Sequence, residues 1–124
     1  MTASGSNILL ATGIATTVDH TGSQYLFCKE DGTIAVVAEV ATGVIQNNPN
    51  GTLSGGATIS AARIGISRVV SSAAVAAGAS VAPDAAGKAR TAVALDVPAG
   101  VSLNAATGAD EMLFVLLNLG GSVF

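Results

Sequence analysis

This chain has few of the side chains that carry out chemistry. Among its 124 residues there is no Trp, one Tyr, one His and one Cys, and only 10% of the residues are charged. A single cysteine excludes an internal disulfide framework. One His and one Cys do not provide the ligand spacing of a zinc site. The composition therefore points away from an enzyme, and we expect no catalytic residues, no cofactor and no metal.

Clustered positive charge is also absent from the sequence. The net charge is −3 at pH 7, and the basic residues are scattered, at Lys29, Arg63, Arg68, Lys88 and Arg90. Proteins that bind nucleic acids gather Lys and Arg on one surface to neutralise phosphates. We therefore expect no binding to DNA or RNA.

No apolar run is long enough for a membrane-spanning helix. Residues 112–117 are all apolar, but a helical span needs roughly 20 such residues. No Lys or Arg precedes the apolar patch at residues 8–10, so a secretory signal is not expected either. The sequence predicts a protein that does not contact membranes.

Small residues dominate what is present. Half of the chain is hydrophobic, yet 24 residues are Ala and 15 are Gly. Ala buries much less apolar area than Leu or Phe, whereas ordering each residue costs on the order of 1–2 kcal/mol. The isolated chain is therefore expected to be marginally stable and to gain burial from a partner. Cys28 lies in an apolar run and is expected to be a buried, inert thiol.

Two pairs of adjacent carboxylates, at residues 30–31 and 110–111, are candidates for acid–base work. An Asp-His pair at residues 19–20 is a candidate for part of a Ser-His-Asp triad. No nucleophile motif accompanies them. We interpret all three pairs as solvated turn and loop residues.

Short apolar segments separated by Gly-, Pro- and Asn-rich turns are typical of a mainly β protein. We predict a small β-sandwich or barrel of short strands with one short helix and an extended N-terminal arm. Residues 8–124 form one domain and residues 1–7 a flexible arm. The expected strands are at residues 8–14, 24–29, 33–40, 57–59, 64–70, 79–82, 88–94 and 111–119.

Four of these strands are predicted to form two hairpins, 24–29 with 33–40 and 79–82 with 88–94. Both faces of the last strand are expected to be buried, by the core or by a neighbouring molecule, because residues 112–117 are all apolar. Residues 71–78 are the helical candidate, with Ser71 or Ser72 as N-cap and Gly78 as the stop. Residues 98–110 are predicted to be mostly loop.

The candidate interface residues belong to the arm and to the strands. The arm either contacts a partner or is a disordered tail. Arg63 and Arg68 either pair with acids across an interface, which suits the fork geometry of arginine, or lie on a solvated strand face. The arm residues are Met1, Thr2, Ala3, Ser4, Gly5, Ser6 and Asn7.

Residues 41–92 contain a spaced series of turns and small residues. The series is Gly-Val-Ile-Gln-Asn-Asn-Pro at 43–49, Gly-Ile-Ser-Arg-Val-Val at 65–70, Ala-Ala-Gly-Ala-Ser-Val at 76–81 and Asp-Ala-Ala-Gly-Lys at 84–88. It resembles the small capsid decoration (cement) proteins of tailed bacteriophages.

The resemblance implies a β-rich homotrimer on the outer surface of the virion capsid, made in the bacterial cytoplasm. Such a protein bridges neighbouring subunits of the major capsid protein, and its N-terminal arm often makes part of the contact. No catalytic residues come with the family. Two alternatives remain, a tail, fibre or spike component and a small ligand-binding β-barrel.

Overall fold

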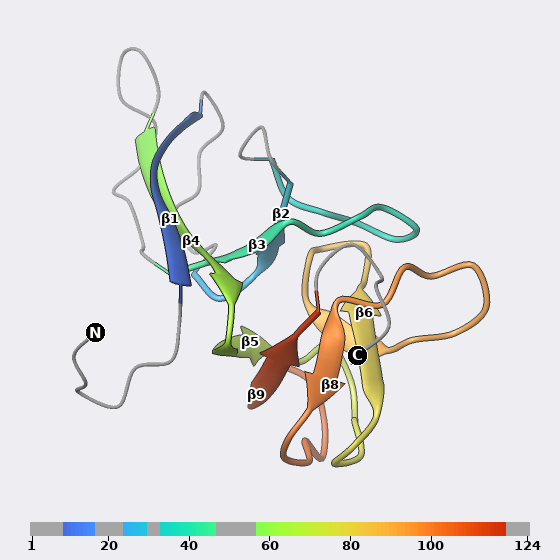
Figure 1. Ribbon diagram of the computed structural model, residues 1–124. Helices are drawn as coiled ribbons and strands as arrows, with labels where there is room; N and C mark the ends of the chain where they lie inside the picture. Colours follow the sequence, from blue (N-terminus) through green and yellow to red (C-terminus); the bar gives the residue numbers. More distant parts are fainter. Residues whose placement is uncertain (1–8, 17–23, 30–32, 47–56, 119–124) are drawn as a thin grey trace.

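The computed structural model describes residues 9–16, 24–29, 33–46 and 57–118 (Figure 1). All regular secondary structure in these ranges is β-strand, so the prediction of a mainly β fold is confirmed. The strands are β1 (Leu9–Thr16), β2 (Phe27–Cys28), β3 (Gly43–Ile45), β4 (Ala57–Ile64), β5 (Ile66–Val70), β6 (Ser80–Pro83), β7 (Ala89–Thr91), β8 (Gly100–Ser102) and β9 (Met112–Leu117).

The strands form two antiparallel sheets. One has the order β1-β4-β3-β2 and the other the order β5-β9-β8-β6-β7. The chain passes from the first sheet to the second at Gly65, which separates β4 from β5 and has a φ of 103°. Glycine adopts such a φ without the steric cost that a Cβ would bring. One long segment can therefore serve both sheets (Figure 1).

One cluster of buried side chains draws on both sheets. Phe27 and Val44 come from the first sheet, and Val69, Val81 and Leu113 come from the second. The rest of the cluster includes many alanines, namely Ala35, Ala41, Ala62, Ala89, Ala99 and Ala106. The core is therefore shared between the sheets and is built largely from small side chains.

A second buried cluster shows how closely the backbones approach. It consists of Cys28, Ile45 and Ala61, and Cys28 is buried as the sequence predicts. A Cβ at Gly43 would lie 2.8 Å from the Cβ of Ala61. Only glycine fits at that distance, so β3 and β4 pack at the limit that side chains allow.

The first predicted hairpin is only partly correct. Cys28 and Ile34 form a single antiparallel bridge, and the Lys29 N–H donates to the Thr33 carbonyl. The expected strand does not continue to residue 40, because the chain turns back at Val36. The Glu39 N–H donates to the Val36 carbonyl, and the Glu39 carboxylate accepts from the Val36 N–H.

The predicted helix at residues 71–78 is wrong. Ser71 instead forms a parallel bridge with Ala89, and Val75 forms an antiparallel bridge with Ala106. Two turns of helix are too short to be stable alone. Pairing with segments distant in sequence satisfies the same main-chain groups, so it overrides the local helix propensity of the alanines.

The second predicted hairpin is confirmed as the antiparallel pair of β6 and β7. Residues 98–110 hold a strand that the sequence analysis predicted as loop. This strand, β8, pairs with both β6 and β9. The strand has only three residues, which is too few to show an alternating pattern, and it begins at Gly100, a residue type that is typical of turns.

The two faces of β9 differ. Leu113, Val115 and Leu117 are buried, whereas Met112, Phe114 and Leu116 are exposed. The core therefore does not cover both faces of this strand. Burial of the outer face by a neighbouring molecule stays a prediction. The proposed arm, residues 1–7, and its boundary with the domain lie outside the described residues.

Gly100 provides a test of the close packing between β8 and β9. A Cβ here would overlap the Leu116 carbonyl oxygen and would lie 2.7 Å from Cγ1 of Val115. Because backbone cannot move aside cheaply, Gly100→Ala is expected to lower the free energy of unfolding in urea by about 1–3 kcal/mol. Gly108→Ala is the control, since its Cβ would meet only Oε2 of Glu111, at 3.9 Å. Equal stability of the two variants would contradict this account.

Candidate interaction surface

The outward side of the five-stranded sheet is largely apolar over three adjacent strands. We call this surface the outer face and define it by six residues, Ile66 and Arg68 of β5, Val101 of β8, and Met112, Phe114 and Leu116 of β9. All are exposed except Val101, which is half-buried. Side chains alternate between the faces of a strand, so the buried neighbours of these residues point into the core.

The strand register gathers these side chains into one surface. Leu116 lies opposite Ile66 on one side and opposite Val101 on the other, so three apolar residues form a row across the sheet. Phe114 lies opposite Arg68. Directly opposed residues on one face are close enough for their side chains to touch. The outer face is therefore continuous and does not consist of isolated apolar residues.

Arg68 contributes the single charge of this surface. Its guanidinium carbon lies 5.8 Å from the ring centroid of Phe114, within the range of a cation–π contact. Phe114 nevertheless remains 43% exposed. Arg68, one of the interface residues predicted from the sequence, thus lies on an exposed surface that is otherwise apolar.

Arg63 lies elsewhere, in β4 of the other sheet. It is the extra residue where the register between β1 and β4 shifts, since Leu9 faces Ile64 and Leu10 faces Ala62. The two arginines therefore belong to different sheets and make no common site. The third candidate, residues 1–7, lies outside the described residues.

A second apolar feature is the loop of residues 92–98, which joins β7 to β8. Its Val93 is exposed, and its Leu95 is 92% exposed. Leu95 has a φ of 74° at the third position of a turn that the Asp96 N–H closes on the Val93 carbonyl. This position favours Gly or Asn, and a side chain with a Cβ costs about 1–2 kcal/mol there. Because Leu95 is exposed, packing of its side chain within the chain does not offset this conformational cost.

Asp96 holds this loop in place. Its side chain is only 2% exposed and accepts two hydrogen bonds from Nη2 of Arg90, at 2.8 and 3.0 Å. It also accepts from the Val93 N–H at 3.0 Å. The Val93 N–H and then the Arg90 guanidinium hold the pKa of this carboxyl below its usual value, against the opposing effect of desolvation. The loop is therefore an ordered projection.

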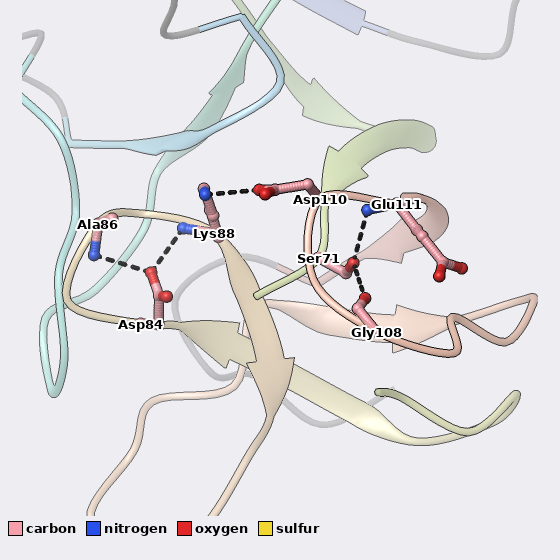
Figure 2. Close-up of polar contacts among 7 residues, drawn as sticks. All are labelled: Ser71, Asp84, Ala86, Lys88, Gly108, Asp110 and Glu111. Atoms are coloured by element: carbon pink, nitrogen blue, oxygen red, sulfur yellow. Dashed lines mark hydrogen bonds and ion pairs between the residues drawn. The ribbon is translucent and has the colours of Figure 1, made fainter. Parts of the chain in front are cut away.

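A polar network braces the turns around the same sheet (Figure 2). The Asp84 carboxylate accepts from the N–H groups of Ala86 and Lys88, both at 2.8 Å. Lys88 in turn pairs with Asp110 at 2.6 Å. The hydrogen bond and charge of Asp110 raise the pKa of the Lys88 ammonium.

Ser71 joins the loop before β9 to this network (Figure 2). Its hydroxyl is buried, donates to the Gly108 carbonyl at 2.7 Å and accepts from the Glu111 N–H at 3.0 Å. The Glu111 carboxylate accepts from the hydroxyl and N–H of Thr107, and these bonds lower its pKa. The carboxylates of Asp110 and Glu111 are therefore bonded to Lys88 and Thr107 of the same chain. The pairs at residues 19–20 and 30–31 lie outside the described residues.

The segments that carry the family resemblance have structural roles in this fold. Gly65 separates two strands, and residues 84–88 form the turn between β6 and β7. Gly87 in that turn has a φ of 82°, and its carbonyl accepts from the Phe27 N–H. The residues of the pattern thus set the path of the backbone, and the exposed apolar surface lies mostly outside the pattern.

The described ranges contain no group of three His, Cys, Asp or Glu side chains placed as metal ligands. Over the same ranges, no helix is long and apolar enough to cross a membrane. No protein-family model, no curated protein and no solved structure matches the chain.

Most of the outer face and all of the 92–98 loop could not be predicted from the sequence. The uniform apolarity of residues 112–117 was the available signal, but it did not show which side of the strand would be left outside. The outer face is an apolar surface and the 92–98 loop is an ordered projection. Both are suited to contact with another macromolecule.

Ser71 tests the bracing of the loop before β9. Ser71→Ala would leave the Gly108 carbonyl and the Glu111 N–H without their partner in a buried position. We expect the free energy of unfolding to fall by about 1–3 kcal/mol, the usual cost of unsatisfied buried polar groups. Ser72→Ala is the matched control, because the Ser72 contact to Ala89 uses the main-chain N–H. A neutral Ser71→Ala variant would show that this bracing contributes nothing.

Asp96 gives a prediction for pH dependence. Because its pKa is lowered in the folded state, its stabilisation is complete above the ordinary value of 3.8 and is lost as pH falls through the lower folded-state value. Asp96→Asn should therefore destabilise the protein at neutral pH, on the order of 1 kcal/mol, and by less in strong acid.

Urea unfolding of this variant across the acid range provides the measurement. Asp110→Asn is the control, since the Asp110 side chain is 69% exposed and exposed ion pairs contribute little to stability. A deficit of Asp96→Asn that is the same at every pH would rule out the carboxylate as its source.

Proposed function

We propose that this protein is a structural virion protein, a capsid decoration protein that binds the outer surface of an icosahedral phage head. In this proposal it acts as a homotrimer and stabilises the head by bridging subunits of the major capsid protein. The observation that carries the proposal is the outer face, an ordered apolar surface that the described residues leave uncovered and that another molecule of an assembly would cover.

The energetics of the fold support a role in an assembly. A core rich in alanine contributes little apolar burial for its length, while large side chains such as Phe114 remain outside. Association would bury them and would add to the stability of the folded chain. Among assemblies, the resemblance of residues 41–92 favours the phage head.

The braced turns also support this role. A protein that holds a pressurised shell together gains from rigid contact surfaces, because ordering flexible segments on binding weakens association. The hydrogen bonds of Asp84, Asp96 and Ser71 fix three separate turns. The net charge of −3 suits an outer surface that does not bind the packaged genome.

Particles with and without the protein provide the test. Phage heads that lack it are expected to release DNA at a lower temperature and after milder osmotic shock, and added purified protein should restore their resistance. Equal survival of the two kinds of particle would refute the stabilising role. A tag on the protein that is seen by electron microscopy on the tail or its fibres would favour a tail component instead.

A further inference from the structure

The two exposed apolar features lie at opposite sides of the five-stranded sheet. The 92–98 loop leaves β7, which is one edge strand, whereas the outer face is centred on β5 and β9 at the other edge. In Figure 1 the loop extends to the right, in orange, away from β5 and β9. Within one chain each feature remains exposed. Two copies, however, can bring one loop onto one outer face.

The loop is already shaped for docking. Asp96 fixes it through Arg90 and Val93, and the positive φ of Leu95 directs an aliphatic side chain into solvent. Strained positions persist where the surrounding structure imposes them and are frequent at binding sites. A rigid projection loses little conformational entropy when it binds. An apolar surface on which the loop can pack is formed by the row of Ile66, Leu116 and Val101 together with Phe114.

Charge favours the loop over a second outer face as the occupant. Arg68 is the single charged residue of the outer face, so pairing two outer faces about a twofold axis would bring like charges into one interface. Such juxtaposition opposes binding. The loop has one charged residue, Asp96, and its carboxylate is nearly buried and engaged by Arg90. Because the charges of Asp96 and Arg90 balance each other, the loop of a second copy adds no net positive charge beside Arg68.

We propose that copies of this chain associate head to tail, with the 92–98 loop of one copy docked on the outer face of the next. Because the two contact surfaces differ, every copy uses both, and the series ends only when it closes into a ring. The contact is made between copies of the chain alone. It therefore holds whether or not the assembly is a phage head, and its test uses purified full-length protein without particles.

Two complementary variants test the contact by light scattering coupled to size-exclusion chromatography. Leu95→Asn removes the projection, and Asn tolerates the positive φ, so the fold is retained. Phe114→Glu charges the outer face, and the new carboxylate lies opposite Arg68 within the same chain. We expect the natural chain to form a closed oligomer and each variant to run as a single chain of 12.0 kDa.

The decisive sample is a mixture of the two variants. Leu95→Asn keeps an intact outer face and Phe114→Glu keeps an intact loop, so the mixture should form a pair of one chain each, twice the single-chain mass, and nothing larger. A chain that carries both substitutions should pair with neither. Ile64→Thr, which removes an apolar side chain that is 60% exposed on the other sheet, should leave the oligomer intact.

Three results would overturn the proposal. If the natural chain is a single chain at all concentrations, the outer face binds a different protein. If Leu95→Asn assembles like the natural chain, the loop is not in the contact. If both variants are folded by circular dichroism but do not pair when mixed, the two surfaces do not meet each other.

Discussion

The close approach of backbones at small residues is the constraint on which this structure depends. Gly43 fits against Ala61 because it has no Cβ, and Gly100 fits against the Leu116 carbonyl for the same reason. The shared core repeats this with a set of buried alanines. Close packing preserves van der Waals contact and main-chain pairing, but each small side chain removes little apolar area from water. The fold is thus well packed without a large hydrophobic contribution.

The same constraint explains why large side chains appear on the surface. In β9 the inward residues Leu113, Val115 and Leu117 already occupy the space beside the alanines, whereas the described residues leave the opposite face of the strand exposed. A core of small residues between two thin sheets gives such a strand one buried side. Its outer residues Met112, Phe114 and Leu116 are then available to a partner, and their burial there would supply what the core does not.

Sequence reasoning succeeded where the signal is local. The turn at residues 84–88 follows from the φ freedom of glycine and the capping ability of Asp84, and it joins two real strands, whereas the expected strand at 64–70 is in fact interrupted at Gly65. It failed where pairing is distant in sequence. Residues 71–78 favour a helix until Val75 meets Ala106, and β8 is a strand only because two others flank it. The positive φ of Leu95 leaves no mark in the sequence, so that part of the interaction surface was not predictable.

The distribution of the few charged groups bears on function as well. Each carboxylate in the described ranges bonds to a group of the chain itself, from Glu39 beside Lys29 to Asp84, Asp96, Asp110 and Glu111 in the turns. These bonds fix turns that the Gly- and Ala-rich backbone would otherwise leave with many conformations. Rigid turns hold the outer face and the 92–98 loop in constant relation to each other. If the chain associates with identical copies as proposed, contacts at fixed angles require that constancy more than they require reactive groups.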